Sequence, residues 1–129
     1  MPGSYLLDTN IAIAVLESEV DLQSQQGSRF GAYLNTIVLG ELLFGAENSQ
    51  RVQKNRLRIE TLAAVCPVLP CDAETARQYG RVRKALLDKG RPIPENDLWI
   101  AASARRYGLI LATRDGHFDY VDDLMTETW

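Results

Sequence analysis

Short apolar runs alternate along this chain with segments whose apolar residues recur at helical spacing. The runs that we expect to form strands are residues 5–7, 32–34, 65–69, 109–113 and, as an edge strand, 124–129. The segments that we expect to be helical are residues 11–16, the stretch after Thr36, residues 50–64, residues 72–90 and residues 94–108. Residues 18–30 are polar and predict a loop or a helix end. This alternation predicts an α/β fold, in which helices cover both faces of a parallel sheet.

Individual residues mark where several of these helices begin or end. Thr36 and Asp72 are suited to the N-cap position of the helices that follow them. Gly90 fits the position just past the end of a helix, and Pro94 fits the first turn of the next one. The length of 129 residues predicts one domain over residues 1–129. In a fold of this class, the active site lies outside the carboxyl ends of the strands.

Composition and charge limit the classes of function. A net charge of −3 argues against a general nucleic-acid binder, although an acidic metal site and a local basic face can coexist in a nuclease. No apolar run approaches the roughly 18 residues of a membrane helix, and the N-terminus lacks the features of a signal peptide. Cys66 and Cys71 are the only cysteines, and we expect them to be reduced, buried thiols of a cytoplasmic protein.

Two aspartates stand where the fold class places chemistry. Asp8 directly follows the first apolar run, and Asp115 follows the run 109–113. Either residue alone is also explained as a turn or cap residue, because aspartate is common in both roles.

Two further carboxylates lie on helix faces that are otherwise apolar or small. Glu41 has Ile37 and Phe44 as helical neighbours, and Asp97 has Ile93 and Ile100. A buried carboxylate is costly unless it is paired or binds a metal. A salt bridge to an arginine would also explain Glu41, and the helix dipole would also explain Asp97.

Together these four carboxylates predict one shared site. Carboxylates in close quarters need a cation to remain ionised, and oxygen ligands suit Mg²⁺. Such a site is typical of metal-assisted phosphodiester hydrolysis.

Four sequence blocks resemble the motifs of PIN-domain ribonucleases, in the order of that family. The blocks are residues 6–10 (LLDTN), 40–46 (GELLFGA), 93–102 (IPENDLWIAA) and 113–118 (TRDGHF). The set is most similar to the VapC-type toxins of toxin–antitoxin pairs. The resemblance implies a five-stranded parallel sheet, Mg²⁺- or Mn²⁺-dependent endoribonuclease activity on RNA, a homodimer and a cognate antitoxin.

The resemblance also assigns roles to residues at the motif positions. It implies that Asp8, Glu41, Asp97 and Asp115 bind the metal and are catalytic. The neighbouring polar residues expected to orient carboxylates and water are Thr9, Asn10, Asn96 and Thr113. Arg114, beside Asp115, is a candidate contact to RNA or to the acidic cluster. The sequence leaves open whether Asp119 joins the site.

The sequence is also compatible with other functions. The chain could be a non-catalytic binding module that dimerises and joins a DNA-binding antitoxin in repressing their operon. A phosphohydrolase of the haloacid-dehalogenase type would need an aspartate where Asn10 stands. His117 is the only histidine, so a zinc site is not favoured, and we expect this side chain to lie at the surface without a catalytic role.

Overall fold

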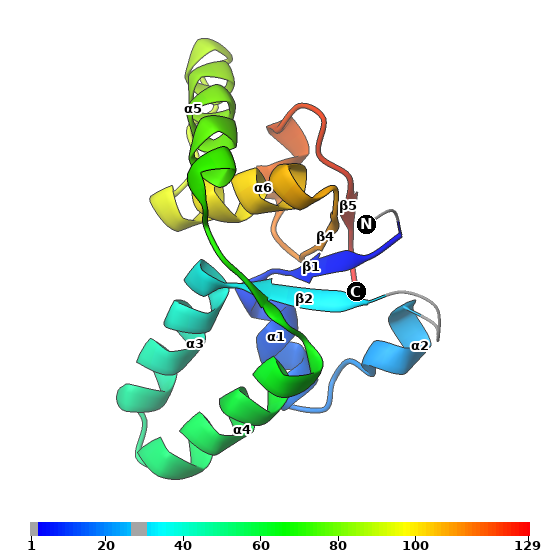
Figure 1. Cartoon of the computed structure of the whole chain (residues 1–129), viewed down its shortest axis with the longest axis vertical. Coiled ribbons are helices and arrows are strands. Elements are labelled where there is room, and N and C mark those ends of the chain that lie inside the picture. The colour runs from blue at the N-terminus through cyan, green and yellow to red at the C-terminus, as the bar shows by residue number, and fades with distance from the viewer. Residues whose placement is uncertain (1–2, 27–30) are drawn as a thin grey trace.

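A computed structural model describes residues 3–26 and 31–129 of the chain. The strands are β1 (Tyr5–Leu7), β2 (Ala32–Asn35), β3 (Val68–Leu69), β4 (Ile110–Ala112) and β5 (Thr126–Glu127). The α-helices are α1 (Thr9–Leu16), α2 (Leu22–Gln26), α3 (Thr36–Glu47), α4 (Val52–Val65), α5 (Ala73–Asp88) and α6 (Glu95–Tyr107), and η1 (Gly116–Tyr120) is a 3₁₀ helix. The alternation of strands and helices expected from the sequence is thus confirmed (Figure 1).

The five strands form one sheet in the order β3-β2-β1-β4-β5, and every neighbouring pair is parallel. The expected edge strand in the C-terminal tail is β5. Strand β1 lies at the centre, and its three residues are all buried. All of these strands point the same way, so their carboxyl ends meet at one edge of the sheet.

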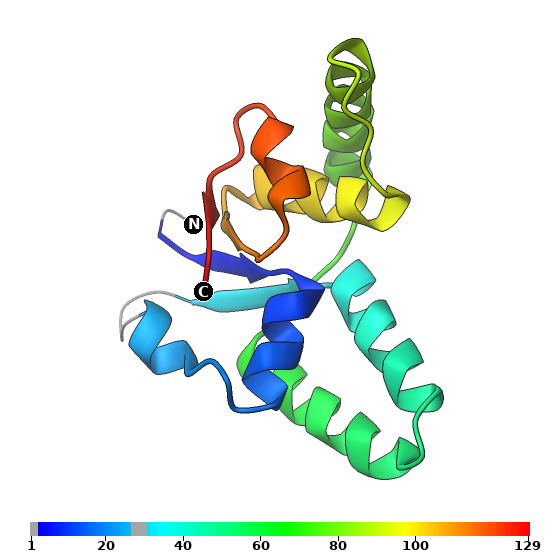
Figure 2. The same ribbon diagram turned by 180° about the vertical axis from the view of Figure 1, so that it is seen from behind.

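Helices flank the sheet on both sides, which gives the three-layer α/β fold. Figures 1 and 2 show α5 and α6 on one side, and α1, α3 and α4 on the other. Leu6, Leu34 and Leu111 from the three central strands are completely buried between these layers. Phe118 of η1 is also buried.

Several helix ends were predicted correctly. Asp72 caps α5 by accepting a hydrogen bond from the amide of Thr75. Gly90 follows α5 with φ +68°, a backbone conformation that glycine adopts without strain. Within residues 18–30, α2 occupies 22–26, and residues 27–30 of this segment lie outside the described residues.

Three predicted boundaries were wrong, each for a local reason. The cap of α3 is Asn35, whose side chain accepts from the amide of Val38 at 2.8 Å, and Thr36 is already helical. Pro94 precedes α6 in an extended conformation, with ψ 150°, instead of lying in its first turn. Strand β3 is shorter than the run 65–69, because Val65 is the last residue of α4, Cys66 is its C-cap, and Pro67 has no amide to donate to a neighbouring strand.

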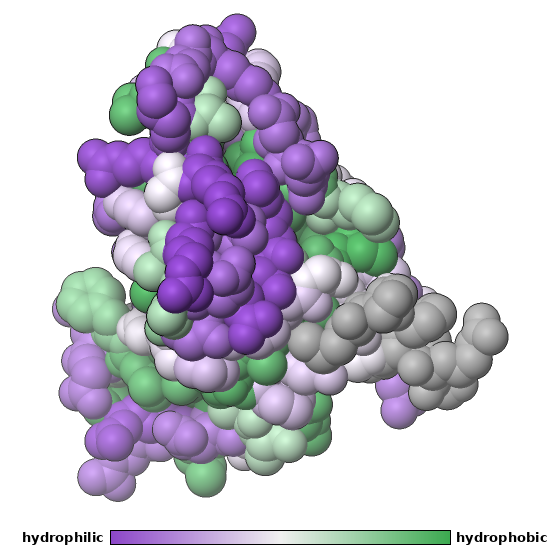
Figure 3. All heavy atoms as spheres, turned by 45° about the horizontal axis from the view of Figure 1, so that its top comes forward, coloured by the Kyte–Doolittle hydropathy of each residue, from purple (hydrophilic) through white to green (hydrophobic). Residues whose placement is uncertain are grey.

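Hydrophilic and hydrophobic side chains occupy different regions of the outer surface. On the face in Figure 3, hydrophilic side chains gather in the upper part, over α5, and hydrophobic ones are exposed lower down. The large apolar side chains that are most exposed are Phe44, Leu57 and Val65. None of the helices in the described ranges is long and apolar enough to cross a membrane.

Candidate active site

The site lies where β1 and β4 end side by side. These strands are direct neighbours, and the Asp8 amide continues their pairing by donating to the carbonyl of Ala112 at 2.9 Å. Asp8 is the first residue after β1, and Asp115 follows β4 after Thr113 and Arg114. The two aspartates therefore come from adjacent strand ends, as the fold class predicted.

Asp8 is buried and surrounded by donors. Its Oδ1 accepts from the amide of Thr9 at 2.8 Å, and its Oδ2 accepts from the Thr113 hydroxyl at 2.7 Å and the Asn10 amide group at 3.2 Å. Burial raises the pKa of Asp8, and the hydrogen bonds from Thr113 and Thr9 oppose that rise. The negative charges of Asp115 and Glu41 raise the pKa further, so these three acids share one electrostatic environment.

Glu41 is joined to this centre through Thr9. The Thr9 hydroxyl donates to Oε1 of Glu41 at 2.7 Å, while its amide donates to Asp8. The first turn of α1 therefore holds the carboxylate that follows β1 and one carboxylate of α3 in fixed relation. Glu41 is half-buried, and the expectation that its helix face is buried was wrong at Phe44, which is 71% exposed.

Asp97, Asp115 and His117 form the tightest cluster among the described residues. One ligand atom of each lies within 4.8 Å of the others. The Nδ1 atom of His117 is 3.3 Å from Oδ2 of Asp97 and 3.1 Å from Oδ2 of Asp115. The single histidine, expected to be a bystander, thus contacts two of the four predicted carboxylates.

A local turn explains why His117 faces the site. Asp115 caps η1, and its Oδ1 accepts from the His117 amide at 2.9 Å. The turn brings the ring back over the aspartate that starts it. A capping aspartate two residues before the histidine was the signal in the sequence that could have indicated this placement.

The negative charge at the site exceeds its compensation by protein groups. Burial raises the pKa of Asp97, a hydrogen bond with His117 opposes the rise, and the charges of Asp8 and Asp115 add to it. Hard oxygen donors that raise one another's pKa are the donor set that a divalent cation such as Mg²⁺ fits. Asp8, Glu41, Asp97 and Asp115 are the residues that could hold such an ion.

The other sequence-predicted residues divide into two groups. Thr9, Asn10 and Thr113 all hydrogen-bond directly to Asp8 or Glu41. Asn96 is exposed, and among the described residues its side chain makes no hydrogen bond to the carboxylates. Asp119 is exposed and lies outside the cluster of Asp97, Asp115 and His117.

Arg114 points away from the acidic cluster. Its Nε donates to the backbone carbonyl of Trp129 at 3.0 Å, and its Nη1 lies 3.5 Å from Glu19. Its backbone amide does contact the site, since it donates to Oδ1 of Asn10 at 3.3 Å. The guanidinium of Arg114 therefore has a carboxylate partner of its own and makes no ion pair with the four predicted carboxylates.

The chain matches a known protein family and characterised relatives over nearly its whole length. Residues 5–124 match the family model described as "PIN domain". The chain is 34% identical to the tRNA(fMet)-specific endonuclease VapC of Shigella flexneri over 128 residues, which covers 97% of both chains. It is also 34% identical to ribonuclease VapC2 of Haemophilus influenzae, again over 97% of each chain.

Solved structures agree with the sequence relatives. A VapBC2 structure from Rickettsia felis, bound to a DNA fragment from the promoter, superposes with a TM-score of 0.89 at 26% identity and covers 97% of this chain and 98% of the other. VapBC-1 from nontypeable Haemophilus influenzae gives a TM-score of 0.87 at 32% identity, covering 97% of each chain. The chain belongs to the PIN-domain family, among the VapC ribonucleases of toxin–antitoxin pairs.

Proposed function

We propose that this chain is a divalent-metal-dependent endoribonuclease whose metal is held by Asp8, Glu41, Asp97 and Asp115. The observation that carries the proposal is the approach of Asp97 and Asp115 to within ligand distance of each other, beside Asp8, whose hydrogen-bonded Thr9 also holds Glu41. Burial, and after it the charges of the neighbouring carboxylates, raises the pKa of Asp8 and of Asp97. Mg²⁺ or Mn²⁺ is the cation class that this oxygen-rich donor set favours.

The roles of the individual residues follow from their contacts. When bound, the cation supplies Lewis-acid chemistry to a phosphodiester of RNA. Thr113, Thr9 and Asn10 orient both oxygens of Asp8 and hold Glu41 at a fixed position beside it. The Nδ1 atom of His117 lies between the carboxylates of Asp97 and Asp115, which orients its ring at the site.

The biological context that we propose is a toxin neutralised by a cognate antitoxin in the cytoplasm. The supporting observation is that the solved relatives are VapBC complexes, aligned over nearly the whole chain. We also propose a homodimer and an RNA substrate, both implied by the resemblance to VapC toxins.

A second role is favoured by a specific observation. The related complexes from Rickettsia felis and Salmonella typhimurium were solved bound to DNA, the former to a promoter fragment. We therefore propose that this chain, with its antitoxin, also represses its own operon. The net charge of −3 indicates that the antitoxin supplies most of the DNA contact.

The deciding experiment is cleavage of a mixed pool of small RNAs by the purified chain. The reactions contain Mn²⁺ or EDTA, and the Asp97→Asn variant is run in parallel. Discrete products that need the metal and are absent with the variant support the proposal. If the folded protein cleaves nothing in the pool, the ribonuclease proposal loses its support and the repression role alone remains.

A further inference from the structure

Arg91 lines a cleft with Asp115 and has no carboxylate partner among the described residues. Arg114 is paired with Glu19, and Lys89 is paired with Asp122 at 2.6 Å. Arg91 is exposed, and among the described residues it makes no ion pair. An RNA phosphate meets no competing carboxylate at this guanidinium.

The backbone of Arg91 is fixed by the end of α5. The Arg91 amide donates to the carbonyl of Leu86 at 2.9 Å, and the Gly90 amide donates to the carbonyl of Leu87 at 3.0 Å. These paired bonds are a Schellman motif, which requires the positive φ of Gly90. Arg91 therefore leaves α5 in a defined direction.

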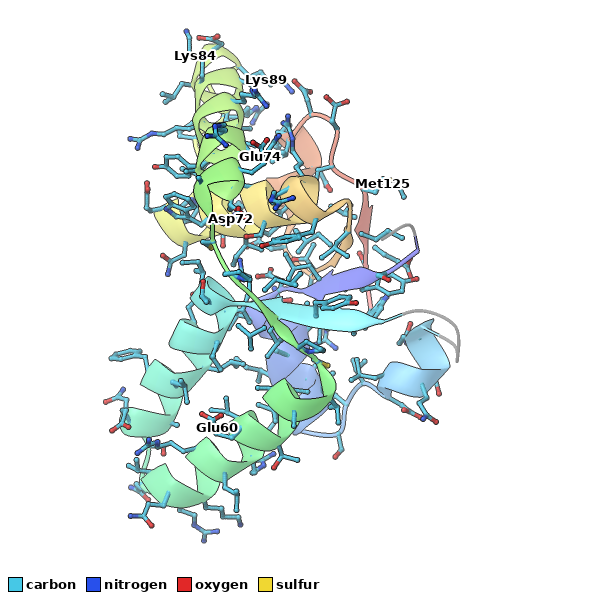
Figure 4. All side chains as sticks on the ribbon, viewed as in Figure 1. Glu60, Asp72, Glu74, Lys84, Lys89 and Met125 are labelled. Atoms are coloured by element: carbon cyan, nitrogen blue, oxygen red, sulfur yellow. The ribbon has the colours of Figure 1, made fainter. Side chains whose placement is uncertain are left out.

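The side chain of Arg91 rests on Tyr120. The guanidinium carbon lies 4.5 Å from the centre of the Tyr120 ring, within the range of a cation–π interaction. Tyr120 is held in turn by Lys89, whose Nζ donates to the Tyr120 carbonyl at 2.8 Å. Lys89 lies at the end of α5 remote from Asp72 (Figure 4). The guanidinium is thus placed before any ligand arrives, which lowers the entropy lost on binding.

Arg91 and Tyr120 share a cleft with the active site. A cleft of about 290 Å³ is lined by Arg91, Pro92, Ile93, Asp115, Gly116, His117 and Tyr120. Tyr120 is the last of the five residues of η1, and Asp115 caps the start of the same short helix. One wall of the cleft is therefore cationic and another belongs to the carboxylate cluster.

We propose that Arg91, held on the ring of Tyr120, binds a backbone phosphate of the RNA strand next to the phosphodiester that is cleaved. The inference rests on the proposed ribonuclease function. A strand that crosses the carboxylates brings several phosphates to an acidic region, and a fixed guanidinium offsets the repulsion. Arg91 is the described arginine that lines the cleft of Asp115 and His117.

The test measures RNA binding as a function of salt. The probe is a short, fluorescein-labelled, single-stranded RNA of mixed sequence, and Asp97→Asn is the background so that the probe stays intact. Each phosphate contact contributes about 0.7 to the slope of log K against log salt on single strands. We expect Arg91→Ala to reduce the slope by about 0.7 and Arg91→Lys to retain it. Tyr120→Ala is expected to weaken binding without changing the slope, and Tyr120→Phe to bind as the parent does.

Arg77→Ala is the matched control, because Arg77 is an exposed arginine paired with Glu74 near the opposite end of α5. It should leave the slope unchanged. An unchanged slope in Arg91→Ala, or an equal loss in Arg77→Ala, would overturn the assignment of Arg91.

A cleavage assay separates this inference from the proposed function. In the chain with Asp97 intact, Arg91→Ala should raise KM and leave kcat unchanged. If the parent cleaves RNA and Arg91→Ala matches it in KM and slope, only the phosphate contact is refuted. If the parent does not cleave but the slope still depends on Arg91, the contact stands and the nuclease proposal fails.

Discussion

The Thr113 hydroxyl donates to Oδ2 of Asp8 at 2.7 Å and accepts from the amide of Asp115 at 3.0 Å. One buried oxygen thereby joins the carboxylate after β1 to the backbone that carries the carboxylate after β4. We expect Thr113→Val, which keeps the shape and removes the hydroxyl, to lower cleavage strongly. The loss of one buried and one partly buried hydrogen bond should also destabilise the fold by about 1–3 kcal/mol.

The measurement is cleavage rate together with the Mg²⁺ concentration at half-maximal rate, and urea unfolding gives the stability. A positioning role predicts that Thr113→Val needs more Mg²⁺. Thr113→Ser keeps the hydroxyl and should recover most of the rate. A serine variant as impaired as the valine variant would show that the methyl group, and not the hydrogen bond, is what matters.

We expect the Asp97 carboxylate to be needed for RNA cleavage and to lower the stability of the folded chain in the absence of metal. Burial raises its folded pKa above that of the unfolded chain, so its ionised form costs stability at neutral pH in the absence of metal. We expect Asp97→Asn to melt at higher temperature than the parent in EDTA at neutral pH. This gain should vanish as the pH falls below about 4, where the carboxyl is protonated in the unfolded chain too. The same variant should have lost RNA cleavage.

The matched control is Asp119→Asn, an exposed aspartate on η1 outside the cluster. It should change neither the melting temperature in EDTA nor the cleavage rate. If Asp97→Asn melted lower than the parent in EDTA, the raised pKa would not describe this carboxyl.

Addition of Mg²⁺ should reverse the order of stability. A cation that binds only the folded chain stabilises it by mass action, and the melting temperature then rises with concentration. We expect such a rise for the parent and a much smaller one for Asp97→Asn, measured by thermal unfolding in titrations of MgCl₂. Equal rises in both proteins would place the ion elsewhere on the chain.

The positions of some carboxylates in the fold could be predicted from the sequence for a physical reason. Parallel strands end at one edge of the sheet, so Asp8 and Asp115 could be brought together from the order of apolar runs alone. Asp97 was marked by Ile100 at helical spacing, whereas Ile93 lies before α6 and the expectation that it is a helical neighbour of Asp97 was wrong. For Glu41 the same argument was weaker, because Phe44 on that face is exposed.

Contacts that depend on loop geometry could not be predicted in the same way. His117 reaches Asp97 only because the turn capped by Asp115 folds back, and Arg91 meets Tyr120 only because Gly90 ends α5 as it does. No periodic pattern encodes such pairs. That one domain spans residues 1–129 stays a prediction.

The ion pair of Arg106 with Asp72 should stabilise the fold at neutral pH and lose this contribution in acid. The bonds from Arg106 and from the Thr75 amide hold the pKa of Asp72 well below its usual range. A depressed folded pKa adds stability above about pH 4 and loses it as the pH falls through the folded pKa. We expect Arg106→Ala to lower the melting temperature at neutral pH, with a deficit that shrinks below about pH 4.

Thermal unfolding over a range of pH checks this expectation, with Arg105→Ala as the control. Within residues 3–26 and 31–129, the hydrogen bond of Arg105 is to the backbone carbonyl of Asp122, at 3.2 Å, and it has no ion pair, so its removal should give no such acid dependence. A deficit of Arg106→Ala that stays constant into strong acid would contradict the role given to Asp72.

The two cysteines should differ sharply in reactivity. Burial raises the pKa of the Cys66 thiol to about 11, and its side chain is 1% exposed. The expectation that both thiols are buried was wrong for Cys71, which is partly exposed and lies 3.4 Å from the Thr36 hydroxyl.

Because the thiolate is the reactive form, we expect one thiol to react rapidly with Ellman's reagent at about pH 8 in the folded chain. Both should react in denaturant, and Cys71→Ser should remove the rapid phase. A rapid phase that survives in Cys71→Ser would mean that α4 opens readily at Cys66, and the packing described for that end of the helix would then be wrong.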